Sequence, residues 1–376
     1  MVKKSAIVIG AGIAGLATAR ALAGKGFSVK VFERTEKATG ASIRNFGMLW
    51  PIGQPEGKLY ERALRSRNVW KGIGDDGGVW YDPVGSLHLA YFADEWKVLQ
   101  ELHELFRAQG RPVSLLTRDQ IASRSPAAAQ KNLLGGLFSE DEIIVDPREA
   151  MAALPKYLHE KSGIEFHWGK CISYVADETV YIGNDEEYSA DLIFICNGAD
   201  FETLYPEVFA RYPLTKVKLQ MMRLRTQPNN WRIGPALCGG LSLIHYKSFK
   251  VAPSLPVLNK RYEEEMSDYI QWGIHVMVSQ NGKGELTIGD SHEYGLTHDP
   301  FDKEFINTMV LEYLRQFAQF QDWTVSESWN GIYPKLTDGG TDLFFSPEPH
   351  VYIVNGLGGA GMTMSFGFAE ECIAGL

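Results

Sequence analysis

Near its N-terminus the chain reads Ala6-Ile7-Val8-Ile9-Gly10-Ala11-Gly12-Ile13-Ala14-Gly15, and this stretch indicates the fold more strongly than any other. Its first four residues are apolar and mostly β-branched, which is typical of a buried parallel strand. The alanine- and leucine-rich run from Leu16 to Ala23 predicts a helix, which Gly24-Lys25-Gly26 ends. Residues 27–32 predict a second strand. This order of strand, glycine-rich turn, helix and strand predicts a nucleotide-binding βαβ unit.

The glycines of this turn are spaced as a bound pyrophosphate requires. Gly10 permits the tight turn, Gly12 lets the backbone approach the phosphates, and Gly15 lets the helix pack close to the strand. The free N–H groups at the helix N-terminus can then bind the phosphates. Glu33 follows the second strand, where it is placed to accept hydrogen bonds from an adenosine ribose. Its charge disfavours the 2′-phosphate of NADP, so this unit predicts NAD or FAD.

The other end of the chain repeats the order of strand, glycine-rich loop and helix. Residues 351–354 predict a buried strand, Asn355-Gly356-Leu357-Gly358-Gly359-Ala360-Gly361 follows it, and Met362-Thr363-Met364 opens a final helix. Another strand, residues 191–196, leads into Asn197-Gly198. Two helix N-termini that converge on one extended ligand favour FAD over NAD, because the isoalloxazine ring needs a backbone cradle of its own.

Antiparallel structure is expected in two further parts of the chain. Segments 164–168, 171–175 and 179–182 alternate between apolar and polar residues and predict a small antiparallel unit. Residues 274–278 and 285–288 predict a hairpin around the turn Asn281-Gly282-Lys283-Gly284.

Two longer motifs make the pattern specific: Gly40-Ala41-Ser42-Ile43-Arg44-Asn45-Phe46-Gly47-Met48 and the block from Gly356 to Thr363. With them, the chain resembles the D-amino-acid oxidase, glycine oxidase and sarcosine oxidase (DAO) family of FAD-dependent oxidoreductases. The first motif is similar to the family's flavin-contacting G-x-S-x-x-N-x-G and the second to its C-terminal G-x-G-G-x-G-M-T. Shorter similarities follow the family's order at Asp146-Pro147-Arg148, Cys171, residues 286–290 and residues 329–339.

The resemblance covers most of the chain and implies its architecture and chemistry. It implies an α/β fold, with a Rossmann-like (glutathione-reductase-like) FAD-binding domain and a discontinuous mixed-sheet α+β substrate domain. Residues 1–80, 146–212 and 326–376 are expected to form the first, and residues 81–145 and 213–325 the second. The implied reaction is oxidation of a CH–NH2 or CH–NH donor by hydride transfer to flavin N5, followed by hydrolysis of the imine. O2 or another acceptor then takes the electrons.

The FAD contacts that the resemblance implies lie on the glycine-rich turns and the loops beside them. They are Gly10, Gly12, Ile13, Ala14, Gly15, Glu33, Arg34, Ser42, Asn45, Gly47, Met48, Cys171, Asn197, Gly198, Gly331, Gly356, Leu357, Gly358, Gly359, Ala360, Gly361, Met362 and Thr363. Covalent members attach the flavin through a cysteine or histidine in stretches that here read Gly331-Ile332-Tyr333 and Ile43-Arg44-Asn45. Neither residue type is present there, so non-covalent FAD is expected.

One departure from the family concerns the substrate. Members that oxidise amino acids carry an arginine, which binds the substrate carboxylate, where this chain has Tyr333. Simple α-amino-acid oxidation is therefore disfavoured. Residues 42–51 and 243–249 look like the aminophosphonate-associated branch of the family, which is proposed to oxidise compounds akin to 2-aminoethylphosphonate. N-methylated and hydroxylated relatives of that compound are included in the expectation.

A phosphonate carries more charge than a carboxylate and three acceptor oxygens, so its pocket needs several donors. Arg44, His245, Lys247 and Lys335 are the candidates. We assign Lys247, His245 and Tyr333 as catalytic residues, with Lys247 as the cation that assists reoxidation. Arg44, Trp50, Tyr246 and Lys335 are assigned as substrate-binding residues.

Other readings of the sequence stay open. The chain could oxidise a glycine-like, sarcosine-like or cyclic imino acid, with Tyr333 and Arg44 replacing the usual carboxylate clamp. A non-catalytic flavin-binding protein is an alternative of another class. The block from Gly356 to Thr363 argues against an NAD-dependent dehydrogenase.

Composition excludes several classes of protein and partner. With 376 residues and a formal net charge of −9, a nucleic-acid partner is not expected. The four cysteines are scattered, which predicts neither a disulfide framework nor a zinc site, and the histidines show no metal-like spacing, so no metal is expected. The sequence contains neither a secretory-signal pattern nor an apolar run long enough for a transmembrane helix, so a cytoplasmic location is expected.

Overall fold

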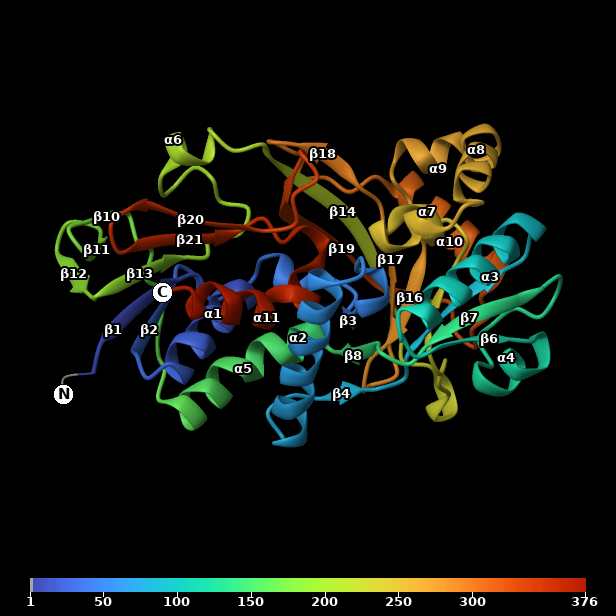
Figure 1. The fold of residues 1–376 in the computed structure, drawn as a ribbon, viewed down its shortest axis with the longest axis horizontal. Helices are drawn as coiled ribbons and strands as arrows, with labels where there is room; N and C mark the ends of the chain where they lie inside the picture. Colours follow the sequence, from blue (N-terminus) through green and yellow to red (C-terminus); the bar gives the residue numbers. More distant parts are fainter. Residues whose placement is uncertain (1–2) are drawn as a thin grey trace.

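The computed structural model describes residues 3–376, and its two largest sheets lie toward opposite ends of the molecule (Figure 1). The first has six strands in the order β20-β21-β13-β1-β2-β9. These are β1 (Ser5–Ile9), β2 (Ser28–Glu33), β9 (Glu165–Trp168), β13 (Leu192–Ile195), β20 (Leu343–Glu348) and β21 (Val351–Asn355). Neighbouring strands are parallel except β20, which is antiparallel to β21. The first and last strands that the sequence predicts therefore share one sheet.

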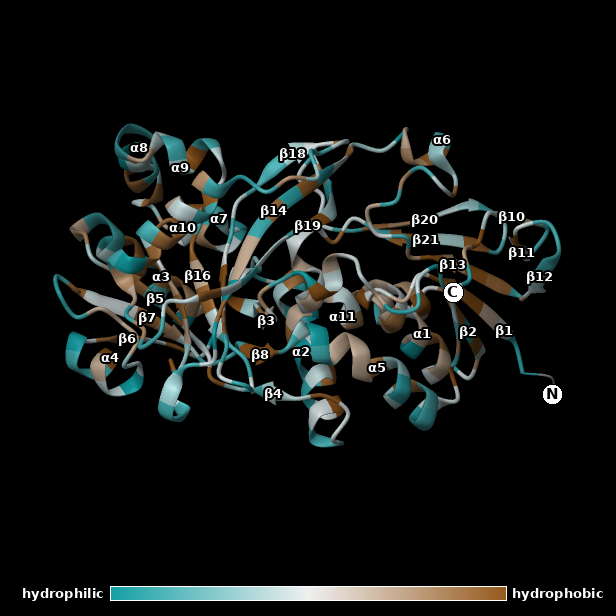
Figure 2. Cartoon of the chain, turned by 180° about the vertical axis from the view of Figure 1, so that it is seen from behind, coloured by the Kyte–Doolittle hydropathy of each residue, from teal (hydrophilic) through white to brown (hydrophobic). Residues whose placement is uncertain are grey.

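Both faces of this sheet are covered, which explains why its central strands β1 and β13 are apolar almost throughout. Side chains alternate along β1, so Ala6 and Val8 join the core on the helical face while Ile7 and Ile9 join the core on the other. The helical face carries α1 (Ile13–Gly24), α2 (Lys58–Asp75), α5 (Pro147–Ser162) and α11 (Gly361–Ala374). On the other face lie β10 (Tyr174–Ala176), β11 (Thr179–Ile182) and β12 (Glu186–Ser189). Figure 2 shows the hydrophobic colouring of β1 and β13 between these layers.

The antiparallel unit expected over residues 164–182 forms only in part. β10, β11 and β12 do pair antiparallel. The segment Glu165–Trp168 instead becomes β9, an edge strand parallel to β2 with Phe166 opposite Val31. Alternating apolar and polar residues do not distinguish the two cases, because any strand with one solvent-facing side shows the same pattern.

The second sheet has nine strands and is mixed, because β5 and β15 are parallel while the other pairs are antiparallel. Its strands are β5 (Ser86–Ala90), β6 (Val113–Leu116), β7 (Gly135–Ser139), β14 (Leu214–Leu224), β15 (Ala236–Cys238), β16 (Met277–Gln280), β17 (Leu286–Gly289), β18 (Glu293–Gly295) and β19 (Val325–Leu336). The expected hairpin is confirmed as β16 and β17, with Gln280 opposite Leu286, although its first strand begins at Met277.

Helices and short segments complete the molecule. Around the nine-stranded sheet lie α3 (Ala93–Ala108), α4 (Arg118–Arg124), α7 (Ser242–His245), α8 (Leu255–Glu265), α9 (Ser267–Gln271) and α10 (Glu304–Phe317), while α6 (Pro206–Phe209) precedes β14. A small sheet of β3 (Met48–Leu49), β8 (Ile143–Val145) and β4 (Tyr81–Asp82) lies between the two large ones. The 3-10 helices are η1 (Ala41–Ile43), η2 (Pro51–Gly53), η3 (Pro228–Asn230), η4 (Lys247–Val251) and η5 (Gly358–Ala360).

Strand β19 links the two halves of the structure. It pairs with β14 along the nine-stranded sheet, and near its end Lys335 forms a β-bridge to Leu357, just before η5 and α11. The proposed boundary at residue 326 falls at the start of this strand, and the division into two domains remains a proposal. Across residues 3–376, no helix combines the length and apolarity needed to cross a membrane.

Candidate functional site

A cavity of about 960 Å³ extends along the carboxyl ends of β1, β2, β13 and β21 and continues to β19 and α7. This volume is at the upper end of the usual range for small-molecule pockets, as an extended ligand requires. Every residue that the sequence analysis assigned to cofactor or substrate lines it, except Gly15 and Gly47. Ligands of open α/β sheets bind at this edge of the strands.

The first glycine-rich turn brings the N-terminus of α1 to the cavity. Gly10 has a φ of +103°, and a Cβ there would lie 2.5 Å from the carbonyl oxygen of Cys196, which directly follows the neighbouring strand β13. A Cβ on Gly15 would overlap the carbonyl oxygen of Gly10. Gly15 therefore acts by close packing, which is why it does not line the cavity itself.

Glu33 lies at the cavity wall with both carboxylate oxygens held. Oε2 accepts a hydrogen bond from the backbone N–H of Ala11 (3.0 Å), and Oε1 accepts from the backbone N–H (3.1 Å) and hydroxyl (2.8 Å) of Thr35. The neighbouring Arg34 donates to Asp200 (2.6 Å), and the exposed Cys171 lines the same end. This is the end at which the sequence analysis places adenosine.

The loop of residues 40–48 is tied to the start of α1. The hydroxyl of Ser42 accepts a hydrogen bond from the backbone N–H of Ile13 at 3.0 Å. Asn45 donates to the carbonyls of Ala41 (3.1 Å) and Ser42 (2.9 Å), and its side-chain oxygen accepts from the backbone N–H of Gly47 (2.8 Å). Gly47 packs where a Cβ would overlap the carbonyl oxygen of Val145, so its role is also to permit close approach.

The C-terminal glycine-rich loop forms the opposite wall. Asn355, which is buried, donates to Asn197 Oδ1 (3.0 Å) and to the carbonyl of Gly198 (2.9 Å), so it joins β21 to β13. The hydroxyl of Thr363 accepts from the backbone N–H of Trp50 at 2.9 Å. Asn355 was not among the predicted site residues. Its position in the quoted loop was visible, but its bridging role depends on contacts between distant segments.

These observations test whether the site fits FAD. Gly358 has a φ of +58° and an ideal Cβ there would meet no atom within 4 Å, so the loop presents bare backbone to the cavity. The α1 and α11 N-termini line the same cavity, at Ile13 and at Met362. Two glycine-rich backbone segments with helix N-termini thus line one long cavity, and the carboxylate of Glu33 lies at its expected ribose end. This arrangement fits a dinucleotide flavin.

Aromatic side chains line the part of the cavity next to β19 and α7. Tyr333 is buried, and its hydroxyl oxygen would lie 3.5 Å from a Cβ on Gly359. The Tyr246 hydroxyl donates to Met277 Sδ at 3.2 Å, and its ring lies 6.1 Å from that of Trp50. Burial raises the pKa of both tyrosine hydroxyls well above the usual value, so both remain neutral hydrogen-bond donors.

Three cations line this same part of the cavity, and each has one hydrogen-bond partner within residues 3–376. Arg44 donates to the carbonyl of Asn330 (3.1 Å). The exposed Lys247 donates to the carbonyl of Gly339 (2.6 Å), and Lys335 donates to the Tyr294 hydroxyl (3.0 Å). None of these three partners is a carboxylate, so their positive charges are available to an anionic ligand.

Three histidines also meet at this end of the cavity: His245, His275 and His292. Burial and the neighbouring histidines lower the pKa of His245 well below the ordinary value, and burial also lowers the pKa of His292. Only His245 was predicted as a site residue. Sequence spacing did not reveal the cluster, because its members come from α7, from the segment before β16 and from the segment between β17 and β18.

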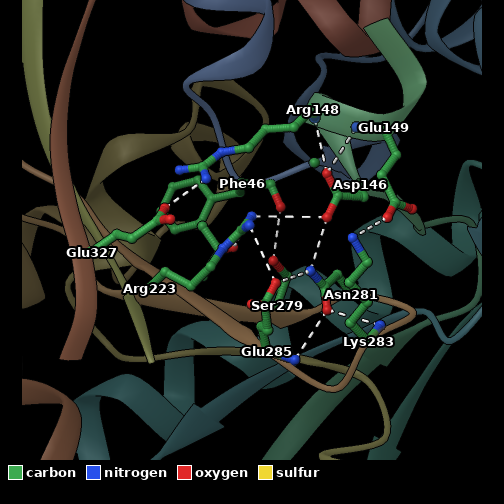
Figure 3. A network of polar contacts seen from close by, with 12 residues as sticks. Phe46, Asp146, Arg148, Glu149, Arg223, Ser279, Asn281, Lys283, Glu285 and Glu327 are labelled. Atoms are coloured by element: carbon green, nitrogen blue, oxygen red, sulfur yellow. Dashed lines mark hydrogen bonds and ion pairs between the residues drawn. The ribbon is translucent and has the colours of Figure 1, made fainter. Parts of the chain in front are cut away.

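A buried polar network holds the nine-stranded sheet against α5 (Figure 3). Asp146, the N-cap of α5, accepts from the backbone N–H groups of Arg148 (2.9 Å) and Glu149 (3.1 Å) and from the Asn281 amide (2.8 Å). Arg223 lies 3.9 Å from Asp146 and 3.3 Å from Glu285. In the same network Ser279 donates to the carbonyl of Phe46 at 2.7 Å, next to the cavity.

A family model and several solved structures match this chain over nearly its whole length. A family model described as "FAD dependent oxidoreductase" (DAO) matches residues 5–374. Among solved structures, glycine oxidase from Geobacillus kaustophilus has a TM-score of 0.76 and 19% identity, with 100% of this chain and 95% of that chain covered. L-proline dehydrogenase from P. horikoshii has a TM-score of 0.77 and 19% identity, with 99% and 92% covered. Identities this low establish the shared fold alone.

Curated relatives match only part of this chain and of their own length. The tRNA 5-methylaminomethyl-2-thiouridine biosynthesis bifunctional protein MnmC of Pseudomonas aeruginosa is 28% identical over 256 residues, which are 63% of this chain and 36% of the relative. MnmC of Burkholderia ambifaria is 32% identical over 123 residues, which are 31% of this chain and 19% of the relative. The match thus spans between 19% and 36% of the length of these relatives.

Proposed function

The chain belongs to the family of FAD-dependent oxidoreductases, and from that premise we propose that it oxidises the C–N bond of a small amine bearing an anionic group. Our leading candidate is an aminophosphonate related to 2-aminoethylphosphonate, including its N-methylated or hydroxylated forms. The observation that carries the proposal is the placement of Arg44, Lys247 and Lys335 along the cavity that Tyr333 and the C-terminal glycine-rich loop also line.

The charge requirement of the substrate supports this choice. A phosphonate offers three acceptor oxygens, and the three cations together with the neutral Tyr333 hydroxyl provide donors along one cavity. Charge-assisted hydrogen bonds are about twice as strong as neutral ones, so the anionic group of the substrate would provide most of the binding energy. Tyr333, in place of an arginine, leaves the carboxylate clamp of amino-acid oxidases incomplete.

The protein's own contribution is binding and orientation. FAD, when bound, supplies the hydride acceptor that oxidises an amine to an imine, which water then hydrolyses. Trp50 and Tyr246 would pack against the carbon chain of the substrate, while the cations hold its anionic group. The N-terminus of α11 presents the positive end of the helix dipole to the cavity and would stabilise negative charge there. Lys247, the most exposed of the three cations, is our candidate for assisting reoxidation by O2 or another acceptor.

The proposal also includes three expectations that come from the sequence. The individual roles of the site residues, non-covalent attachment of FAD and a cytoplasmic location are included in it.

Oxidation of a glycine-like, sarcosine-like or cyclic imino acid is the second candidate. It is favoured by the fold that the chain shares with a glycine oxidase and an L-proline dehydrogenase, and by Arg44, which lines the cavity.

Replacing Arg44 by alanine tests the role of the cations. Loss of one hydrogen bond to a charged group costs about 1.5–3 kcal/mol, so KM for 2-aminoethylphosphonate should rise about 10- to 100-fold. KM for an uncharged amine that is turned over should change less than about threefold. Lys247→Ala should act in the same direction, and steady-state kinetics with both substrates measures the difference.

The matched control is Lys250→Ala. Lys250 lies in η4, as Lys247 does, and is exposed, but it does not line the cavity. The substitution should leave both KM values unchanged. Equal effects of Arg44→Ala on the phosphonate and on the uncharged amine would show that Arg44 does not bind the anionic group.

A further inference from the structure

The three-histidine cluster is compact and adjoins the substrate end of the cavity. His245 ends α7, His275 precedes β16, and His292 follows β17. The rings of His245 and His275 are 3.7 Å apart between centroids, and that of His292 lies 4.9 and 5.2 Å from them. One ring nitrogen from each lies within 4.8 Å of the others. Small rotations of the three side chains would bring these nitrogens to about 3.4 Å from one another, the nitrogen–nitrogen distance that tetrahedral zinc–nitrogen bonds imply.

Of the two buried histidines, His292 is held by a hydrogen bond from behind its ring, and His275 faces a carboxylate without one. His292 Nδ1 lies 2.9 Å from the carbonyl oxygen of Gly273, which makes Nδ1 the protonated nitrogen and leaves Nε2 with a free lone pair. His275 Nδ1 lies 3.0 Å from Asp290 Oδ1. A carbonyl or carboxylate behind a histidine ring is the arrangement that orients metal-binding imidazoles in proteins.

Two atoms of the cluster have no hydrogen-bond partner among the described residues. His275 Nδ1 and Asp290 Oδ1 are both fully buried, and their close approach does not meet hydrogen-bond geometry. Buried polar atoms are almost always paired, so such atoms call for a ligand that completes the site.

From this geometry we propose that His245, His275 and His292 bind a divalent transition-metal ion of the zinc type, with Asp290 beside it. Imidazole nitrogen suits zinc, and three protein ligands leave one coordination position open. All three histidines and Asp290 line the cavity, so that open position faces the substrate. The second part of the inference rests on the proposed function: the ion bound by the three histidines binds an oxygen of the substrate's anionic group.

The metal content of the FAD-loaded protein tests the site. The protein is stripped with a chelator, incubated with Zn2+, passed through gel filtration and analysed by mass spectrometry for zinc per chain. Wild type should retain about one Zn2+ per chain. His275→Gln and His292→Gln should each lower retention at least tenfold. His298→Gln, which changes a histidine that lines the same cavity but lies outside the cluster, should retain about one.

A second measurement on the wild type does not depend on how the variants fold. The Cu2+-loaded protein should show hyperfine coupling to imidazole nitrogens in its electron paramagnetic resonance spectrum. The proposal would be overturned if the wild type retained less than a tenth of an equivalent of each of Zn2+, Co2+, Ni2+ and Cu2+. It would also be overturned if His298→Gln lost as much zinc as His275→Gln and His292→Gln. Both measurements are made without substrate, so failure of the proposed amine oxidation leaves their results unchanged.

Discussion

Gly15→Ala is expected to abolish FAD binding, with the dissociation constant rising at least about 100-fold. A Cβ at this position would overlap the Gly10 carbonyl oxygen and lie 3.0 Å from the Gly10 carbonyl carbon. Both are backbone atoms of the strand-to-helix turn and cannot rotate away. Relief requires α1 to move from β1, which displaces the helix N-terminus that the phosphates need. The overpacking should also lower the free energy of unfolding by about 1–3 kcal/mol, although alanine favours helix more than glycine does.

The matched control for this substitution lies in the same helix. Gly24 ends α1, and an ideal Cβ there meets no atom within 4 Å. Gly24→Ala should therefore bind FAD as tightly as the wild type and be equally stable or slightly more so. Fluorescence titration of the apoprotein with FAD and urea denaturation measure the two effects. If Gly15→Ala bound FAD like Gly24→Ala, the close packing of α1 on β1 would not support the cofactor site.

Asp146→Ala is expected to lower the free energy of unfolding by about 3 kcal/mol. The substitution removes the N-cap of α5, which costs about 0.5–2 kcal/mol. It also leaves the buried Asn281 amide with one acceptor fewer and takes a carboxylate from beside the buried Arg223 (Figure 3). Loss of a partner by buried polar groups typically costs a further 1–3 kcal/mol. Urea denaturation of the FAD-loaded protein measures the change.

Lys283→Ala is the control from the same network. Lys283 pairs with Glu149 at 2.7 Å, but both side chains are exposed, so solvent screens the pair and Lys283→Ala should unfold at nearly the same urea concentration as the wild type. A similar loss of stability in the two variants would mean that burial does not determine the strength of this network.

Local motifs account for the parts of the structure that could be predicted. The turn from Gly10 to Gly15 and the loop from Gly356 to Gly361 are read from consecutive residues, because strand, turn and helix each have a local signature. The β16–β17 hairpin was predictable for the same reason. Strand β9 was misplaced because its partner, β2, is far away in the sequence and apolar alternation does not specify a partner.

Contacts between distant segments explain what the sequence analysis missed. Asn355 was visible in its loop, but its bridge to Asn197 and Gly198 requires β13 and β21 to be neighbours. The histidine cluster depends on the turn after β17 returning to the start of β16, where the backbone of Asp290 pairs with that of His275. Neither arrangement has a signature in consecutive residues.

Anaerobic mixing of the FAD-loaded protein with candidate amines, while the flavin absorbance is followed, tests the central claim most directly. The panel contains 2-aminoethylphosphonate, its N-methyl and 1-hydroxy relatives, sarcosine, glycine and D-alanine. Bleaching of the flavin by one or more phosphonates, and not by the others, is the predicted result. Bleaching by sarcosine or glycine alone would contradict the phosphonate assignment and favour the second candidate. If none of these amines bleached the flavin, amine oxidation itself would be contradicted.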